Sequence, residues 1–249
     1  MKPGAELRRA FAAELGKMVS VWSTAWCAVA AVVLTAGCAA SLANDVVGDA
    51  ERGQASVRTT TPAVDTTAVV DVLAPSVQLA QFAVVALAML VVTSEFATRL
   101  ITGTLQACPR RGTVLAAKAL AVTAVTAPLG LLVGIGGSVV AARVLGEHGT
   151  SPDPAGDVVR VAVYLVAVSL FTVGIGAVLR SAVGTLSVAL VVLVGLLLIS
   201  TPLTDLLPAG LGGHLLDGDG GAGPAAAGLL GWAAAAHLVG YLSLRNRDA

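Results

Sequence analysis

Charged and aromatic side chains are scarce in this sequence. Of its 249 residues, 12% are charged and 4% are aromatic, whereas 56% are hydrophobic, and the mean hydropathy is +0.88. A soluble domain carries about 25% charged residues, so the composition argues against one. The formal net charge is zero. Because there is no basic surplus, we expect no nucleic acid partner.

The sequence also lacks the short motifs of common catalytic and nucleotide-binding sites. It contains no GxxxxGK[ST] phosphate loop, no GxSxG nucleophile elbow and no HExxH pair. Cys27, Cys38 and Cys108 show no pairing pattern and suit small apolar residues better than a disulfide framework. We therefore expect no catalytic residue, metal or cofactor on this chain, and any ATP must bind a separate subunit.

Long stretches without a charged residue are what the sequence does contain. A bilayer requires about 20 apolar residues per helix. These stretches predict an all-α polytopic membrane protein with six transmembrane helices, over residues 21–42, 73–93, 119–142, 160–179, 183–204 and 224–244. Residues 201–223 are rich in Gly, Pro and Leu, which favours short half-helices in the outer leaflet over a simple irregular loop.

Basic residues are unevenly distributed between the two sides of this predicted bundle. With six helices, one side holds eleven of the 15 basic residues and only four of the 15 acidic ones. Because positively charged loops stay in the cytoplasm, we expect both termini to be cytoplasmic. A lipoprotein signal peptide ending before Cys38 is the alternative for the first apolar stretch. Thr35 fits such a site poorly, and five more apolar stretches follow.

Residues 1–20 form a segment distinct from the transmembrane domain of residues 21–249. Apolar residues recur in it at helical spacing, at Leu7, Phe11, Leu15 and Met18. This pattern predicts an amphipathic helix in the cytoplasmic membrane interface, with a solvated tail as the alternative. Trp22 and Trp26 follow, where aromatic rings are expected at the level of the lipid headgroups.

Polar and small residues inside the predicted spans are the next feature. No span contains a charged residue in its centre, which argues against an ion-coupled carrier. Gln78 and Gln81 lie one helical turn apart in the second span, where they line a pathway or, as we favour, bond a neighbouring helix. A stripe of small residues in the third span predicts close packing within the bundle, with a dimer seam as the alternative: Gly130, Gly134, Ser138 and Ala142.

Residues 94–118, SEFATRLITGTLQACPRRGTVLAAK, are a basic stretch between the second and third spans. Ser94 is expected to cap a short helix with Glu95 in its first turn, and Pro109 is expected to end that helix. Arg110 and Arg111 follow at the membrane surface, where they either fix the orientation alone or also contact a partner.

This stretch resembles the loop between the second and third spans in permeases of the type-two ABC exporter family. The shared pattern is Ser-Glu-aromatic, a short helix, Pro-Arg-Arg, and a Lys that opens the next span. Residues 14–26, ELGKMVSVWSTAW, are similar to the entry to the first span in actinobacterial members. The resemblance implies a location in the bacterial plasma membrane and a dimer with a second permease chain, identical or not. It also implies a separate nucleotide-binding ATPase as partner.

Carried over by position, the resemblance implies a surface that couples this chain to the ATPase, formed by Glu14, Lys17, Glu95, Phe96, Arg99, Arg110 and Arg111. The implied function is to move an unidentified substrate outward by alternating opening of the dimer, so that the chain is a transport subunit and no enzyme. The alternative is a non-transporting scaffold or sensor subunit that recruits a cytoplasmic partner.

Overall fold

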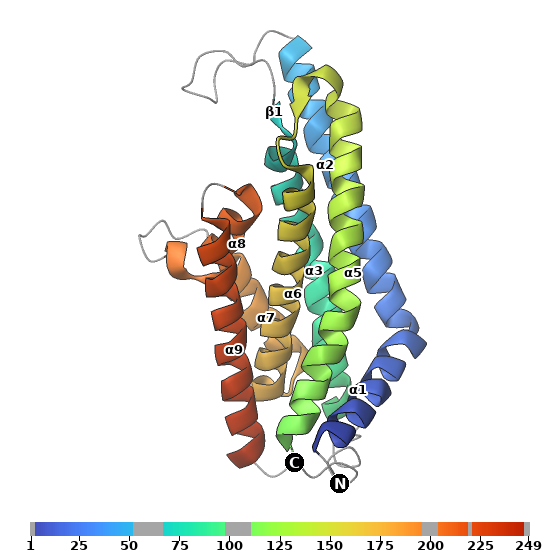
Figure 1. The fold of residues 1–249 in the computed structure, drawn as a ribbon, viewed down its shortest axis with the longest axis vertical. Coiled ribbons are helices and arrows are strands. Elements are labelled where there is room, and N and C mark those ends of the chain that lie inside the picture. Colours follow the sequence, from blue (N-terminus) through green and yellow to red (C-terminus); the bar gives the residue numbers. More distant parts are fainter. Residues whose placement is uncertain (1–2, 52–66, 98–110, 196–203, 219–220, 247–249) are drawn as a thin grey trace.

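The computed structural model describes residues 3–51, 67–97, 111–195, 204–218 and 221–246, which form an elongated helical bundle (Figure 1). The helices are α1 (Pro3–Ser20), α2 (Trp22–Glu51), α3 (Val69–Ala97), α5 (Arg111–Leu145), α6 (Pro154–Leu179), α7 (Ala182–Leu193), α8 (Pro208–Asp217) and α9 (Ala222–Asn246). Two 3₁₀ turns are η1 (Gly146–His148) and η3 (Thr204–Leu206), and a short parallel ladder pairs β1 (Thr67–Ala68) with β2 (Gly149–Thr150). The described chain is therefore all-α apart from this ladder.

Five of these helices, namely α2, α3, α5, α6 and α9, are long and apolar enough to cross a membrane. The expected all-α membrane character is thus confirmed, but the described residues contain five such helices and not the expected six. The predicted span over residues 183–204 begins as α7, which is only 12 residues long and ends where Val194 leaves the helical conformation. Residues 196–203 lie outside the described part of the chain.

Several helices continue beyond the limits expected from the charged residues. The first predicted span ends at residue 42, yet α2 continues to Glu51, and the 35-residue α5 begins at Arg111. At about 1.5 Å per residue, α5 is about 52 Å long, which exceeds the hydrocarbon thickness of about 30 Å. A charged residue marks the membrane surface without ending a helix, which explains the difference.

The part of the bundle farthest from the chain ends has a small apolar core of its own. In Figure 1 the upper ends of α2, α5 and α6 extend well beyond α8 and α9. A separate cluster of buried residues joins α2, α3 and α5 there, namely Ala39, Ala43, Val69, Val72, Ala141 and Leu145. This second core allows the extended helix ends to stay packed where α9 no longer covers them.

Helix α6 is the centre of the bundle and packs closely against α5 on one side and α9 on the other. A Cβ atom at Gly130 of α5 would lie 2.6 Å from the Cα of Ala162 in α6, and one at Gly174 would lie 2.7 Å from the backbone of Ala236 in α9. Gly130 and Gly134 of the predicted stripe are buried, whereas Ala142 is exposed. The buried glycines of the stripe therefore pack within the bundle, which is the alternative we favoured.

The start of α1 and the end of α9 lie at the same end of the bundle, together with the end of α3 and the start of α5 (Figure 1). We call this the terminal end. Helix α1 runs obliquely along α5 there and meets α2 at an elbow. Residues 98–110, which connect α3 to α5, lie outside the described residues.

Candidate functional site

Two carboxylates and two amines form a closed cluster at the terminal end. Lys17 Nζ donates to Glu14 Oε1 at 2.8 Å and to Glu95 Oε1 at 2.6 Å. Lys118 Nζ donates to Glu14 Oε2 at 2.6 Å and lies 2.9 Å from Glu95 Oε2. Each carboxylate therefore has one lysine at each of its oxygens, and positive and negative groups alternate around a ring. We call Glu14, Lys17, Glu95 and Lys118 the charge cluster.

Three helices supply the charge cluster. Glu14 and Lys17 lie three positions apart on α1, whose Met18 is buried and whose Phe11 packs against the main core, so that Glu14 also faces the bundle. Glu95 lies in the last turn of α3, where the helix dipole disfavours a carboxylate. The two lysines offset this repulsion. The ring of contacts connects α1 to α3 and α5, the two helices that flank residues 98–110.

Three members of the cluster are almost completely buried. Glu14 is 4% exposed, Glu95 is 5% exposed and Lys118 is 3% exposed, whereas the Lys17 side chain is 48% exposed. Buried charges are costly unless they are paired. The cluster meets this condition because its two carboxylates and two amines sum to zero charge. Breaking one buried contact would leave an uncompensated charge inside the protein.

The pKa of Lys17 shows that the pairing dominates over burial. Burial alone lowers the pKa of this amine, but the hydrogen bonds and negative charges of Glu14 and Glu95 raise it by more. The net result is a pKa above the ordinary value for lysine. Lys17 is therefore held in its charged form.

The structure corrects how the sequence analysis treated this region. Ser94 does not start a helix, because α3 continues through it to Ala97 and the Ser94 hydroxyl donates to the Leu90 carbonyl at 2.6 Å. Glu95 and Lys118 lie just outside the predicted spans 73–93 and 119–142, yet both are buried, in α3 and α5. The expected coupling surface does not include Lys118. Its position just inside an apolar helix is nevertheless a sequence signal, because a lysine there requires a buried acidic partner.

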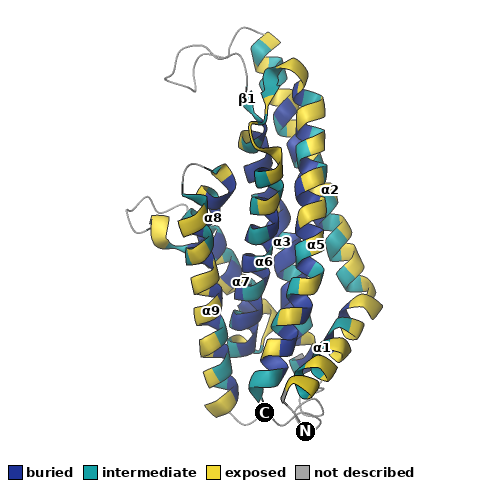
Figure 2. Cartoon of the chain, viewed as in Figure 1, coloured by how far each residue is buried: buried dark blue, intermediate teal, exposed yellow. Residues whose placement is uncertain are grey.

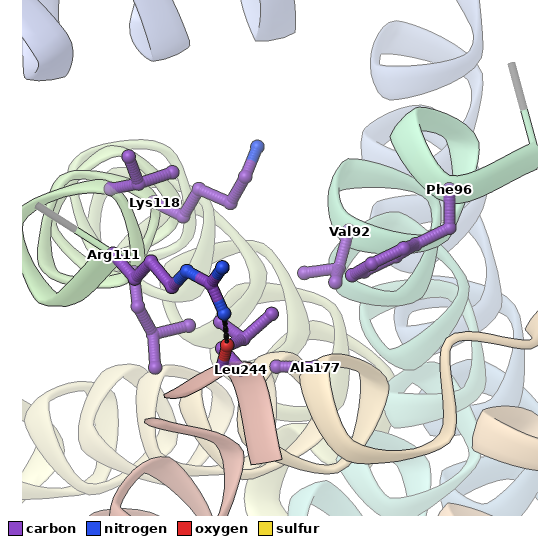
Figure 3. A pocket seen from close by; sticks show the side chains of 8 residues that line it. Val92, Phe96, Arg111, Lys118, Ala177 and Leu244 are labelled. Atoms are coloured by element: carbon purple, nitrogen blue, oxygen red, sulfur yellow. Dashed lines mark hydrogen bonds between the residues drawn. The ribbon is translucent and has the colours of Figure 1, made fainter. Parts of the chain in front are cut away.

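Phe96 and Arg111, two further residues of the expected coupling surface, also make contacts within the chain. The Phe96 ring lies beneath the Arg180 guanidinium, 5.3 Å from ring centroid to Cζ, in a cation–π contact. Arg111 Nη1 donates to the Leu244 carbonyl in the last turn of α9 (Figure 3). This bond satisfies a carbonyl that the helix itself leaves without a partner. Arg99 and Arg110 lie outside the described residues.

A small cavity lies beside the charge cluster, where α3, α5, α6 and α9 converge. Its volume is about 20 Å³. Figure 3 shows Val92 and Phe96 on one side of it, opposite Arg111 and Lys118. A cavity of this size holds about one water molecule and is too small for a substrate.

The two glutamines expected in the second span differ in their surroundings. Gln81 is buried, and its Oε1 accepts a hydrogen bond at 2.8 Å from the hydroxyl of Tyr164 in α6. Gln78 is half-buried. The bond of Gln81 to a neighbouring helix corresponds to the alternative that we favoured over a pathway-lining role.

No family model matches this sequence, and no curated protein matches it either. The class of protein is therefore stated from the fold: it is an all-α protein, and several of its helices are long and apolar enough to cross a membrane. Among the described residues, no three His, Cys, Asp or Glu side chains gather in a group that could hold a metal ion. The charge cluster is accordingly the candidate site.

Proposed function

We propose that this chain is the membrane-spanning permease subunit of an ATP-driven exporter. It pairs with a separate nucleotide-binding ATPase and with a second permease chain, and it moves an unidentified substrate outward. The single observation that carries the proposal is the charge cluster, which links α1 to the two helices flanking residues 98–110. The resemblance of residues 94–118 to the corresponding loop of type-two ABC exporters agrees with this assignment.

The proposed mechanism is mechanical and follows from how the cluster joins helices. A partner that pushes on residues 98–110 acts directly on the ends of α3 and α5, and the ring transmits the displacement to α1. Because α3 and α5 both pack against the central α6, a shift at the terminal end reaches the opposite end through rigid helices. The ATPase supplies the energy, and this chain supplies no catalytic group.

In the proposed topology the bundle lies in the plasma membrane of a bacterium with both termini in the cytoplasm. In this topology the predicted span over residues 183–204, of which α7 is the described part, is a sixth crossing. This is consistent with α6 and α9, which both run towards the terminal end. α1 lies in the cytoplasmic interface. Glu14 and Glu95, which were expected at the coupling surface, are buried and in this proposal connect α1 to α3 and α5. The half-exposed Lys17 and residues 98–110 then face the partner.

Co-purification from native membranes in mild detergent tests the proposal. We expect a P-loop ATPase in a fixed ratio to the tagged chain, and its ATPase activity to be stimulated by reconstitution with the permease. Arg110→Ala/Arg111→Ala should reduce this stimulation while the protein still inserts and folds. Glu95→Gln should reduce it as well, and its folding is measured alongside because it leaves the buried Lys118 with one carboxylate partner fewer. Arg143→Gln, an exposed arginine in the last turn of α5 at the opposite end, is the matched control. Unchanged stimulation in both coupling variants would rule the assignment out.

The second candidate is a scaffold or sensor subunit that recruits a cytoplasmic partner without transporting anything. It is favoured by the same linkage, because a rigid terminal end is also suited to holding a partner in place. ATP-dependent accumulation of a compound in inverted vesicles distinguishes the two. A bound partner without accumulation, or a folded protein without any ATPase, would favour the scaffold or sensor.

A further inference from the structure

The elbow between α1 and α2, which lies on the side of the bundle above the terminal end, exposes a compact apolar surface (Figure 1). Four large apolar residues there are about half exposed or more: Val19 at 75%, Val21 at 49%, Trp22 at 78% and Trp26 at 65%. Other exposed residues continue along both helices away from the elbow (Figure 2). Such a surface is costly in water, and the two indole rings are typical of the boundary between lipid and water.

Two exposed arginines on α1 accompany this surface. Arg8 and Arg9 both have exposed side chains, and neither makes an ion pair with another described residue. Arg8 and Val19 lie about three helical turns apart and therefore on the same flank of α1. The opposite flank, with Phe11, Glu14 and Met18, is turned towards the bundle. The apolar elbow and the basic flank thus face the same surroundings.

From this arrangement we propose that the elbow is a binding surface for anionic phospholipid headgroups. Val19, Trp22 and Trp26 enter the boundary of the acyl chains, which places Arg8 and Arg9 at the phosphates. The anionic character of the lipid follows from the two arginines, because their charges have no acidic partner among the described residues. The inference does not depend on an ATPase partner, so it can fail or hold independently of the proposed exporter function.

Fluorescence quenching of the full-length protein in bilayers tests this inference. The background variant is Trp232→Phe, which leaves Trp22 and Trp26 as the only tryptophans. Brominated phosphatidylglycerol and brominated phosphatidylcholine, each mixed into non-brominated bilayers, serve as the two quenchers. We expect stronger quenching by the anionic lipid, and a preference that weakens with salt. At about 5-fold per arginine, the preference can reach about 25-fold at low salt.

Adding Arg8→Gln/Arg9→Gln to this background should abolish the preference, whereas Arg8→Lys/Arg9→Lys should retain it. Arg143→Gln, at the opposite end of α5, should leave it unchanged. A preference that survives in the glutamine variant, or equal quenching by both lipids in the background protein, would overturn the inference. The absence of quenching by either lipid would overturn it as well, because the elbow would then be covered by protein.

Discussion

Lys118 of α5 donates a 2.6 Å hydrogen bond to Glu14 of α1, which precedes it by 104 positions in the sequence. Both side chains are at most 5% exposed. Lys17, the other amine of the charge cluster, is 48% exposed. The two lysines therefore make equivalent contacts in different surroundings, and burial should decide how much each contributes.

Replacing Lys118 with methionine should destabilise the protein more than replacing Lys17. Removing one partner from a buried ion pair costs about 3–5 kcal/mol, because the remaining charge is left uncompensated. Both changes leave Glu14 and Glu95 short of one positive charge, but water can reach the half-exposed Lys17 position and cannot reach Lys118. We expect Lys118→Met to lower the free energy of unfolding in detergent by about 3–5 kcal/mol and Lys17→Met by less. Equal losses in the two variants would contradict this assignment of burial.

Exchanging the charges of Glu95 and Lys118 should fail to restore stability. In an isolated ion pair, Glu95→Lys/Lys118→Glu would regenerate the attraction. In the ring, however, the new glutamate at position 118 would face Glu14, and the new lysine at position 95 would face Lys17. We expect the double exchange to stay well below the wild type in stability, because only two of the four contacts in the ring remain attractive. Recovery of the wild-type melting temperature would show that the residues form two separate pairs instead of a ring.

The raised pKa of Lys17 predicts a stability difference that disappears only in strong alkali. Its folded pKa lies above the unfolded value of about 10.4, so its contribution is complete below that value and is lost as the pH rises through the folded pKa. The difference in melting temperature between wild type and Lys17→Met should stay constant from pH 7 to about pH 10 and then vanish. A difference that disappears by about pH 9 would mean that burial, and not pairing, dominates.

The helical membrane character could be predicted because it depends on composition, which the chain displays directly. The limits of the helices could not be predicted in this way, because a helix that extends beyond the bilayer can contain charged residues such as Glu51 and Arg111. The sixth span, over residues 183–204, stays a prediction, because only its first part, α7, lies among the described residues. An apolar run such as Val188–Leu193 satisfies a hydropathy criterion even where the described helix ends at Leu193.

The candidate site was predicted in part. Glu14, Lys17 and Glu95 were singled out by resemblance, but as a surface for a partner. Their mutual contact could not be foreseen, because it joins residues separated by 78 positions for Lys17 and Glu95, and such long-range pairing has no local signal. Lys118 was overlooked because a lysine at the start of an apolar stretch is also what the positive-inside rule predicts.

Gly130→Ala should weaken the packing of α5 against α6. The added Cβ would lie 2.6 Å from the Cα of Ala162, so the two backbones must separate. Overpacking of this kind costs about 1–3 kcal/mol. Gly136 lies on the same helix with nothing within 4 Å of its would-be Cβ, which makes Gly136→Ala the matched control. Thermal unfolding should show a lower melting temperature for the first variant only; a similar loss in both would indicate a general effect of helix composition.

Tyr164→Phe tests the buried hydrogen bond that joins α6 to Gln81 of α3. The variant leaves the Gln81 amide oxygen without its donor, which should cost about 1–2 kcal/mol. Adding Gln81→Leu removes the acceptor as well, so the double variant should recover much of the loss. Full additivity of the two changes would show that the residues do not interact. The same double variant also tests the proposed exporter function. It should transport at the wild-type rate, because the Gln81 amide oxygen is used to join α3 to α6 and does not contact substrate. A loss of transport at restored stability would instead place Gln81 in the substrate pathway.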